Sequence, residues 1–153
     1  MGYGYILLVA LVAGSDQWIK KRIEESNMEQ RERMYLGNRI LIRKHHNRGV
    51  VLNVGSGKRP LVAALSLALT VVVFAGFLVS LGQRGNGLLR TGLSLLLGGA
   101  FSNTYDRLQR KYVVDYLSFG VKWQGLRRVV FNLADFGIIL GALIAVLGTG
   151  GEG

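Results

Sequence analysis

The sequence has no cysteine and only two histidines, so several kinds of active site are excluded at once. Without a thiol there is neither a cysteine nucleophile nor a disulfide framework. His45 and His46 are adjacent, and neighbouring side chains of a strand point to opposite faces of a sheet, so a shared metal ion is not expected. Neither histidine lies in an apolar stretch, which argues against a serine–histidine protease within a membrane. The sequence therefore predicts no metal and no cofactor.

Nucleic-acid and nucleotide binding are also poor explanations. The formal net charge is +10, but no recognised basic module accompanies it, so a nucleic-acid partner is not expected. Gly57-Lys58 resembles the end of a phosphate-binding loop. Leu52, however, stands where the first glycine of that motif belongs, and Arg59 replaces the required serine or threonine. This segment is interpreted as a flexible connector.

Half of the residues are hydrophobic, and they are bunched into long runs. Leu61–Gly82 carries no charge over 22 residues, enough to cross a bilayer core of about 30 Å. The N-terminal run lacks a basic leader and a clear cleavage site, which favours a retained membrane anchor over a signal peptide. We expect a single all-α membrane domain over 1–153, with four transmembrane helices near 2–19, 61–82, 88–105 and 129–149. Gly98, Gly99, Gly137 and Gly141 are candidates for close helix packing, or simply ordinary membrane-helix composition.

The polar loop 20–60 has a strand pattern of its own. Ile40 and Ile42 alternate with polar residues, and Val50–Val54 follows a turn-like Asn47-Arg48-Gly49. The pattern predicts a small β-hairpin or cradle beside the helices.

The acidic residues suggest where the chemistry lies. Asp106, Asp115 and Asp135 stand where apolar runs begin or end, and four spans would bring Asp16 to the same end of the bundle. Asp135 interrupts its run about six residues in, or roughly 9 Å at the rise of a helix. An ionised carboxylate near hydrocarbon costs about 3 kcal/mol on insertion scales. This convergence predicts a functional site.

Paired carboxylates can hydrolyse a peptide without a metal. Two such groups in a low-dielectric site share one proton, so one can take a proton from water while the other polarises a carbonyl. Three alternatives remain open at this point. Each acid could pair with a nearby base for packing, as Asp106 with Arg107; Asp135 could relay protons in a small coupled transporter; or the chain could be an inactive membrane adaptor.

Four motifs in order resemble one family. They are Asp16-Gln17-Trp18-Ile19-Lys20, Asn47-Arg48-Gly49, Gly98–Arg107 followed by Val113-Val114-Asp115-Tyr116, and Phe131-Asn132-Leu133-Ala134-Asp135. Together they span nearly the whole chain and resemble the bacterial lipoprotein signal peptidases (signal peptidase II).

The resemblance implies an aspartyl endopeptidase that cuts the signal peptide from diacylglyceryl-modified prolipoproteins just before the lipidated cysteine. It places the catalytic dyad at Asp115 and Asp135. Asn103 and Asn132 would orient the dyad, and Arg107, held by Asp106, would contact the substrate backbone. Asp16, Lys20, Asn47 and Gly49 would shape the site. A monomer in the cell membrane, in contact with membrane lipids, is expected.

Two features depart from the family pattern or conflict with it. Val50-Val51-Leu52, Ser102 and Ile19 replace the family's usual residues, which bears on the substrate more than on the reaction. The family places its site outside the cytoplasm, with both termini inside. Yet 17 of the 19 Lys and Arg residues lie in loops 16–60 and 106–128, a charge bias that favours a cytoplasmic site. We give the ordered motifs more weight than the charge bias.

Overall fold

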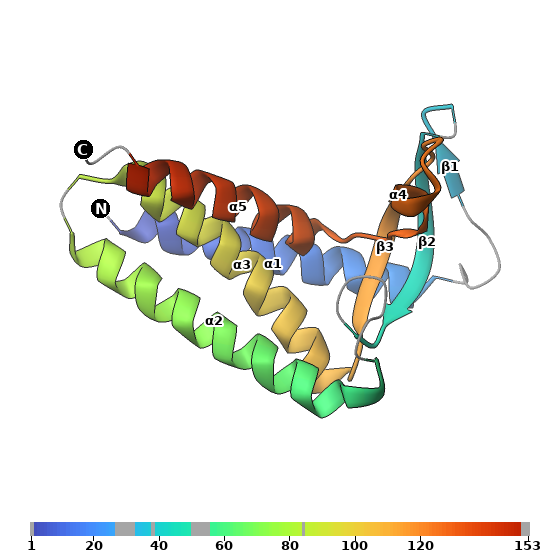
Figure 1. The fold of residues 1–153 in the computed structure, drawn as a ribbon, viewed down its shortest axis with the longest axis horizontal. Coiled ribbons are helices and arrows are strands. Elements are labelled where there is room, and N and C mark those ends of the chain that lie inside the picture. The colour runs from blue at the N-terminus through green and yellow to red at the C-terminus, as the bar shows by residue number, and fades with distance from the viewer. Residues whose placement is uncertain (1, 27–32, 38, 50–55, 84, 151–153) are drawn as a thin grey trace.

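A computed structural model describes residues 2–26, 33–37, 39–49, 56–83 and 85–150. Its long helices are α1 (Tyr3–Glu24), α2 (Arg59–Gly82), α3 (Gly87–Gln109) and α5 (Leu133–Gly150). The shorter elements are β1 (Arg33–Tyr35), β2 (Ile40–Asn47), the 3-10 turn η3 (Ser56–Lys58), β3 (Val113–Phe119) and α4 (Gln124–Arg128). The long helices form a bundle, and the strands lie across one end of it (Figure 1).

Helix α3 is the central element of the bundle, because it packs against α1, α2 and α5. Its contact with α5 depends on glycine at several positions. A Cβ atom at Gly99 would lie 2.3 Å from the carbonyl oxygen of Ala134, and one at Gly141 would lie 2.4 Å from the backbone nitrogen of Leu96. Any larger side chain would push the two backbones apart. Close glycine packing is therefore the correct one of the two interpretations.

Within the described residues, α2 and α5 are long and apolar enough to cross a membrane, whereas α1 and α3 do not meet that criterion. The reason is that α1 and α3 carry polar and charged side chains. Asp16 and Lys20 of α1 and Asn103 and Asp106 of α3 are polar, but all four are turned inward and buried. Both helices expose large apolar side chains along their length: Tyr3, Ile6, Leu7, Leu11 and Trp18 on α1, and Leu88, Phe101, Tyr105 and Leu108 on α3.

The sheet is antiparallel, in the order β1-β2-β3. The predicted cradle is present. Of the predicted hairpin, only its first strand, β2, lies within the described residues. Strand β2 pairs on one side with β1 and on the other with β3, with Asn47 opposite Val113 and His45 opposite Asp115. The sequence reading did not anticipate β3, which follows α3. The part of the predicted hairpin at 50–54 lies outside the described residues.

Two predicted boundaries are wrong in a way that matters for the site. Helix α1 continues to Glu24, past the expected end at 19, so Lys20 is helical. The last helix begins at Leu133 rather than 129. Residues 129–132 are extended instead, because Phe131 pairs with Leu117 of β3 through backbone hydrogen bonds in both directions.

Candidate active site

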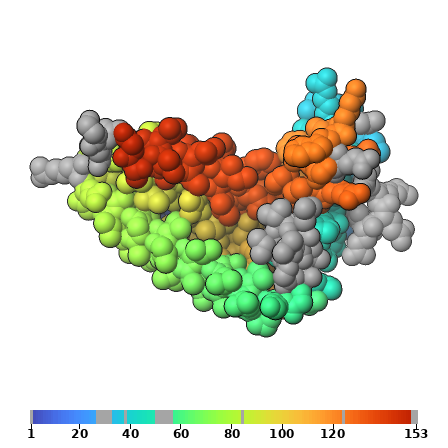
Figure 2. Space-filling model, viewed as in Figure 1, coloured from blue at the N-terminus to red at the C-terminus, as the bar shows by residue number. Residues whose placement is uncertain are grey.

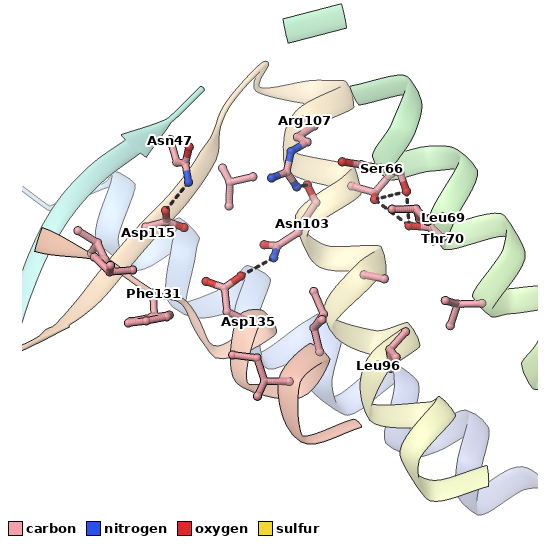
Figure 3. A pocket seen from close by; sticks show the side chains of 18 residues that line it. Asn47, Ser66, Leu69, Thr70, Leu96, Asn103, Arg107, Asp115, Phe131 and Asp135 are labelled. Atoms are coloured by element: carbon pink, nitrogen blue, oxygen red, sulfur yellow. Dashed lines mark hydrogen bonds between the residues drawn. The ribbon is translucent and has the colours of Figure 1, made fainter. Parts of the chain in front are cut away.

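A cavity of about 510 Å³ lies where the bundle meets the sheet. Its walls come from α2, α3 and α5, from β3 and the end of β2, and from the extended segment before α5. Most lining side chains are apolar. The charged ones are Arg107, Asp115 and Asp135, and Asn47, Ser66, Thr70, Asn103 and Thr104 are polar. Figure 3 shows Asp115 and Asp135 on one wall and Ser66 and Thr70 on another.

Strand alternation directs Asp115 into this cavity. Val113 and Asp115 line it, whereas Val114 and Tyr116 point the other way and pack with Ile23 of α1 in a small core. This is the period-two pattern of a strand with two buried faces. Asp115 is consequently a buried carboxylate, 3% exposed, at the junction of sheet and bundle.

A helix cap holds Asp135. The side chain of Asn132 accepts a hydrogen bond from the Asp135 backbone N–H at 2.9 Å, and Oδ2 of Asp135 accepts one from the Asn132 backbone N–H at 3.0 Å. This reciprocal pair is a capping box at the start of α5. Asp135 thus lies in the first turn of its helix. The prediction that it stands six residues inside the span is wrong, because the preceding residues join the sheet.

Three asparagine side chains hold the two carboxylates together. Asn132 donates to Oδ1 of Asp115 at 2.8 Å, while its backbone N–H donates to Asp135, so the two acids share one residue as partner. Asn47 donates to Oδ2 of Asp115 at 3.1 Å, and Asn103 donates to Oδ1 of Asp135 at 2.8 Å; Figure 3 marks both bonds. Within the described ranges, every hydrogen bond to either acid comes from an amide.

Beneath this pair lies a second group of charges, which we call the buried ionic cluster: Asp16, Lys20, Asp106 and Arg110. Lys20 is fully buried, and its Nζ lies 2.7 Å from Asp16 and 3.0 Å from Asp106. It also donates to Oδ1 of Asn103 at 2.9 Å. Arg110 bonds the other oxygen of Asp106. The cluster is therefore joined to the dyad through Asn103.

The predicted link between Asp106 and Arg107 is not the one in the structure. Asp106 pairs with Lys20 and with Arg110, which is four residues further along α3 and on the same helix face. Neighbouring residues on a helix do not face each other, so Arg107 points elsewhere. It lines the cavity and donates to the backbone oxygen of Gly49 at 3.2 Å and to that of Asn103 at 3.4 Å.

The remaining predicted residues divide between the two groups. Asn47 and Gly49 support the dyad side: Asn47 bonds Asp115, and its own oxygen accepts from the Gly49 backbone N–H at 3.1 Å. Asp16 and Lys20 do not line the cavity, because they are in the cluster below it.

Several participants were missed at the sequence level. Tyr116 donates to Asp16 at 3.1 Å and accepts from the backbone N–H of Leu133, so it ties α1 to the start of α5. Gln17 donates to Asp106 at 3.0 Å. Ser102 had been noted only as a departure, yet it donates to Asp16 at 2.6 Å. The four-residue spacing of Asp106 and Arg110 was a usable signal for one contact, whereas Tyr116 depends on the unpredicted strand.

Asp115, which lies outside the helices, has a raised pKa. The pKa of Asp115 is raised from 3.8 to about 7, chiefly by burial and also by the nearby charge of Asp135, while hydrogen bonds from Asn47 and Asn132 oppose the change. A carboxyl with this pKa can hold a proton near neutral pH.

Among the described residues, no group of three or more His, Cys, Asp or Glu side chains is arranged to hold a metal ion.

The fold of this chain is similar to folds of known structure. In three dimensions the fold matches two solved bacterial membrane enzymes. One has a TM-score of 0.80 at 22% identity, covering 95% of this chain and 87% of the other, and the second has a TM-score of 0.79 at 21% identity, covering 98% and 94%. At these identities the likeness concerns the fold, which is that of a bacterial membrane enzyme.

The family follows from the sequence comparison. The family model described as Signal peptidase (SPase) II matches residues 8–149. A lipoprotein signal peptidase of Mesorhizobium japonicum is 33% identical over 93% of this chain and 82% of its own length. That of Halothermothrix orenii is 32% identical over 96% and 93%. The chain belongs to the signal peptidase II family. The prediction of an aspartic peptidase of this family is confirmed.

Proposed function

We propose that this protein removes the signal peptide from lipid-modified prolipoproteins, with Asp115 and Asp135 as the catalytic dyad. The observation that carries the proposal is the joint partner of the two acids: Asn132 bonds one carboxylate through its side chain and the other through its backbone. Both acids also border one cavity with mainly apolar walls, suited to an apolar signal peptide. The names of the relatives in two bacteria agree with this substrate class.

We assign the roles of the two acids from their positions in the fold. Asp115 holds the shared proton, and Asp135, at the start of α5, carries the negative charge, where the helix dipole stabilises it. Asp135 takes a proton from water as the water oxygen attacks the scissile carbonyl carbon. Asp115 gives its proton to the carbonyl oxygen. When the C–N bond breaks, Asp135 protonates the leaving nitrogen, and Asp115 recovers its proton from the hydroxyl of the intermediate.

Arg107 is placed to hold the substrate backbone. It lines the cavity, and two of its guanidinium nitrogens bond backbone carbonyls. A guanidinium carries five N–H donors, so Arg107 in the cavity wall can also donate to a carbonyl oxygen of the substrate. We therefore assign the backbone of the substrate to Arg107.

The membrane arrangement is part of the same proposal. We infer that α1, α2, α3 and α5 all span the membrane, because α1 and α3 have 22 and 23 residues and turn their polar groups inward. At 1.5 Å per residue each is roughly 33 Å long, close to the bilayer core. The protein acts as a single-domain monomer, with both termini cytoplasmic and the sheet outside.

Cysteine labelling tests this orientation, since the chain has no cysteine of its own. Glu25→Cys lies at the sheet end of the bundle and Gln83→Cys at the opposite end, and both positions are exposed. A membrane-impermeant thiol reagent should label Glu25→Cys alone in intact cells. Labelling of Gln83→Cys alone would reverse the orientation in favour of the charge bias.

Substitution of the dyad tests the chemistry. Asp115→Asn and Asp135→Asn should each reduce cleavage of a lipidated precursor by at least about 100-fold, because Asn can neither accept nor share the proton. The double variant should lose about as much as either single one, since the two acids act as a unit. Each variant should still be recovered folded from the membrane. Full processing by the Asp135→Asn protein would rule out the proposal.

A further inference from the structure

Two loops meet at one end of the sheet. Leu36, Gly37 and Arg39, between β1 and β2, lie beside residues 120–123, which lead from β3 into α4. The backbone N–H of Gly120 donates to the oxygen of Arg39 at 2.9 Å, and Ile40 is paired with Phe119. We call this end the sheet tip. In Figures 1 and 2 it extends sideways beyond the outline of the bundle, past α5.

The sheet tip exposes large apolar side chains. Leu36 is 73% exposed, Trp123 74%, Met34 57% and Tyr35 49%. Leu36 and Trp123 come one from each loop, whereas Met34 and Tyr35 belong to the adjoining strand β1. Single exposed apolar residues need no explanation, but two large ones from separate loops that meet at a projecting point indicate contact with an apolar partner.

The backbone at Leu36 strengthens this interpretation. Leu36 has a φ of 51°, in the left-handed region, and the next residue is Gly37 with a φ of 64°. Glycine or asparagine adopts this conformation easily, whereas a bulky side chain is unfavourable there. Folding of the turn therefore does not explain leucine at this position. An outlier of this kind points to a role for the side chain outside the fold.

Charge and position indicate which partner the tip contacts. Arg33, Arg39 and Lys122 are exposed around the apolar group. The strands lie across the bundle, and α5, beside which the tip projects, is apolar and long enough to span a membrane. A membrane around α5 would bring its surface to the hollow seen between α5 and the tip in Figure 2. Tryptophan, tyrosine and flanking basic residues are the side chains that favour this boundary.

We propose that the sheet tip is a membrane anchor, which inserts Leu36 and Trp123 into the headgroup region of the adjacent leaflet and binds anionic phospholipid through Arg33, Arg39 and Lys122. The anchor holds the sheet, and with it Asp115, at a fixed height over the bilayer. It depends on the membrane position of α5 and not on the chemistry of the dyad, so its failure and that of the proposed function are distinguishable.

Fluorescence tests the anchor directly. Trp18→Phe leaves Trp123 as the single tryptophan of the chain. The protein is reconstituted in vesicles of phosphatidylcholine and phosphatidylglycerol, with and without acyl chains brominated near the headgroup. Brominated lipid should quench Trp123 strongly, and aqueous acrylamide should quench it weakly. Vesicles of phosphatidylcholine alone should reduce the lipid quenching, since each basic residue near an anionic surface contributes roughly fivefold to binding.

Leu36→Asn, made in the same single-tryptophan protein, separates anchoring from folding. Asparagine suits the left-handed turn, so the melting temperature in detergent should rise, while lipid quenching of Trp123 should fall. Strong acrylamide quenching without lipid quenching in the parent protein would overturn the proposal. Shielding from both quenchers would also overturn it, in favour of contact with a protein or a second copy.

Discussion

The chain has four aspartates, and the structure divides them into two pairs with opposite surroundings. Asp16 and Asp106 are bonded to a fully buried lysine, and Asp106 also to Arg110. Asp115 and Asp135 are held by amides, within the part of the chain that the structure describes. A cation keeps a carboxylate ionised, whereas amides position it and leave room for a proton. The comparison explains why only one pair suits acid–base chemistry.

The largest effect should come from breaking the buried ionic cluster at its centre. Lys20→Met leaves Asp16 and Asp106 buried without the charge between them, and should lower the free energy of unfolding by about 3–5 kcal/mol. Chemical denaturation in detergent measures this. Lys21→Met is the matched control, because the Lys21 side chain is 71% exposed and lies 3.8 Å from Glu25. Its effect should stay within about 0.5 kcal/mol. Equal effects of the two substitutions would contradict the account.

The next test concerns the difference between the cation-bound pair and the amide-bound pair of aspartates. Asp106→Asn should destabilise the protein by about 1–3 kcal/mol, since Lys20 and Arg110 lose a charged acceptor. The folded fraction should keep kcat within about tenfold of the parent, because Asp106 does not line the cavity. Cleavage assays normalised to folded protein check this. A loss of kcat as deep as that of Asp115→Asn would place Asp106 in the chemistry.

The pH dependence of stability should report Asp115. Its pKa is about 7 in the folded protein against 3.8 as the ordinary value, so between these pH values the folded state holds a proton that the unfolded chain releases. Asp115 therefore makes stability fall as pH rises from about 4 to 7. Burial lowers the pKa of His45, which acts in the opposite direction, so the parent must be compared with Asp115→Asn. The melting temperature of the parent relative to that of Asp115→Asn should fall across this range; a constant difference would contradict the raised pKa.

The smallest effect concerns the end of α3. Lys111 follows the helix with a φ of 68°, a left-handed conformation that favours glycine. Lys111→Gly should raise the free energy of unfolding by roughly 0.5–1 kcal/mol without changing cleavage. Denaturant titration measures it. Lys122→Gly provides the control, since no positive φ occurs there among the described residues, and it should bring no gain.

Much of this site could be predicted from the sequence, and the misses have a physical pattern. The apolar runs and ordered motifs indicated the helices and the residues around the cavity. What they could not indicate was pairing over long distance. Strand β3 lies about 70 residues from its partner β2, so neither the strand nor the inward direction of Asp115 follows from local pattern. The same pairing delays the start of α5 and moves Asp135 to a helix cap.

The partners of the acids were harder to predict than the acids themselves. Asp106 was assigned to its neighbour Arg107, although helical geometry favours Arg110. Ser102 was seen as a departure without a role, because its hydrogen bond to Asp16 joins residues 86 positions apart. The four-residue spacings of Asp16 with Lys20 and of Asp106 with Arg110 indicate a cation beside each of these acids. Only the packing of α1 against α3 brings Lys20 to Asp106 as well.

The central claim is that the amide-bound pair of aspartates holds a proton near neutral pH, with Asp115 as its carrier. Infrared spectroscopy of protein labelled with ¹³C on the aspartate side chains tests it, since these four carboxyl groups are then the only ones that carry the label. At about pH 6, below the pKa of about 7, the spectrum should contain the carbonyl band of a protonated aspartic acid. The band should vanish in Asp115→Asn and persist in Asp106→Asn. A band that survives Asp115→Asn and is lost with Asp106→Asn would contradict the account.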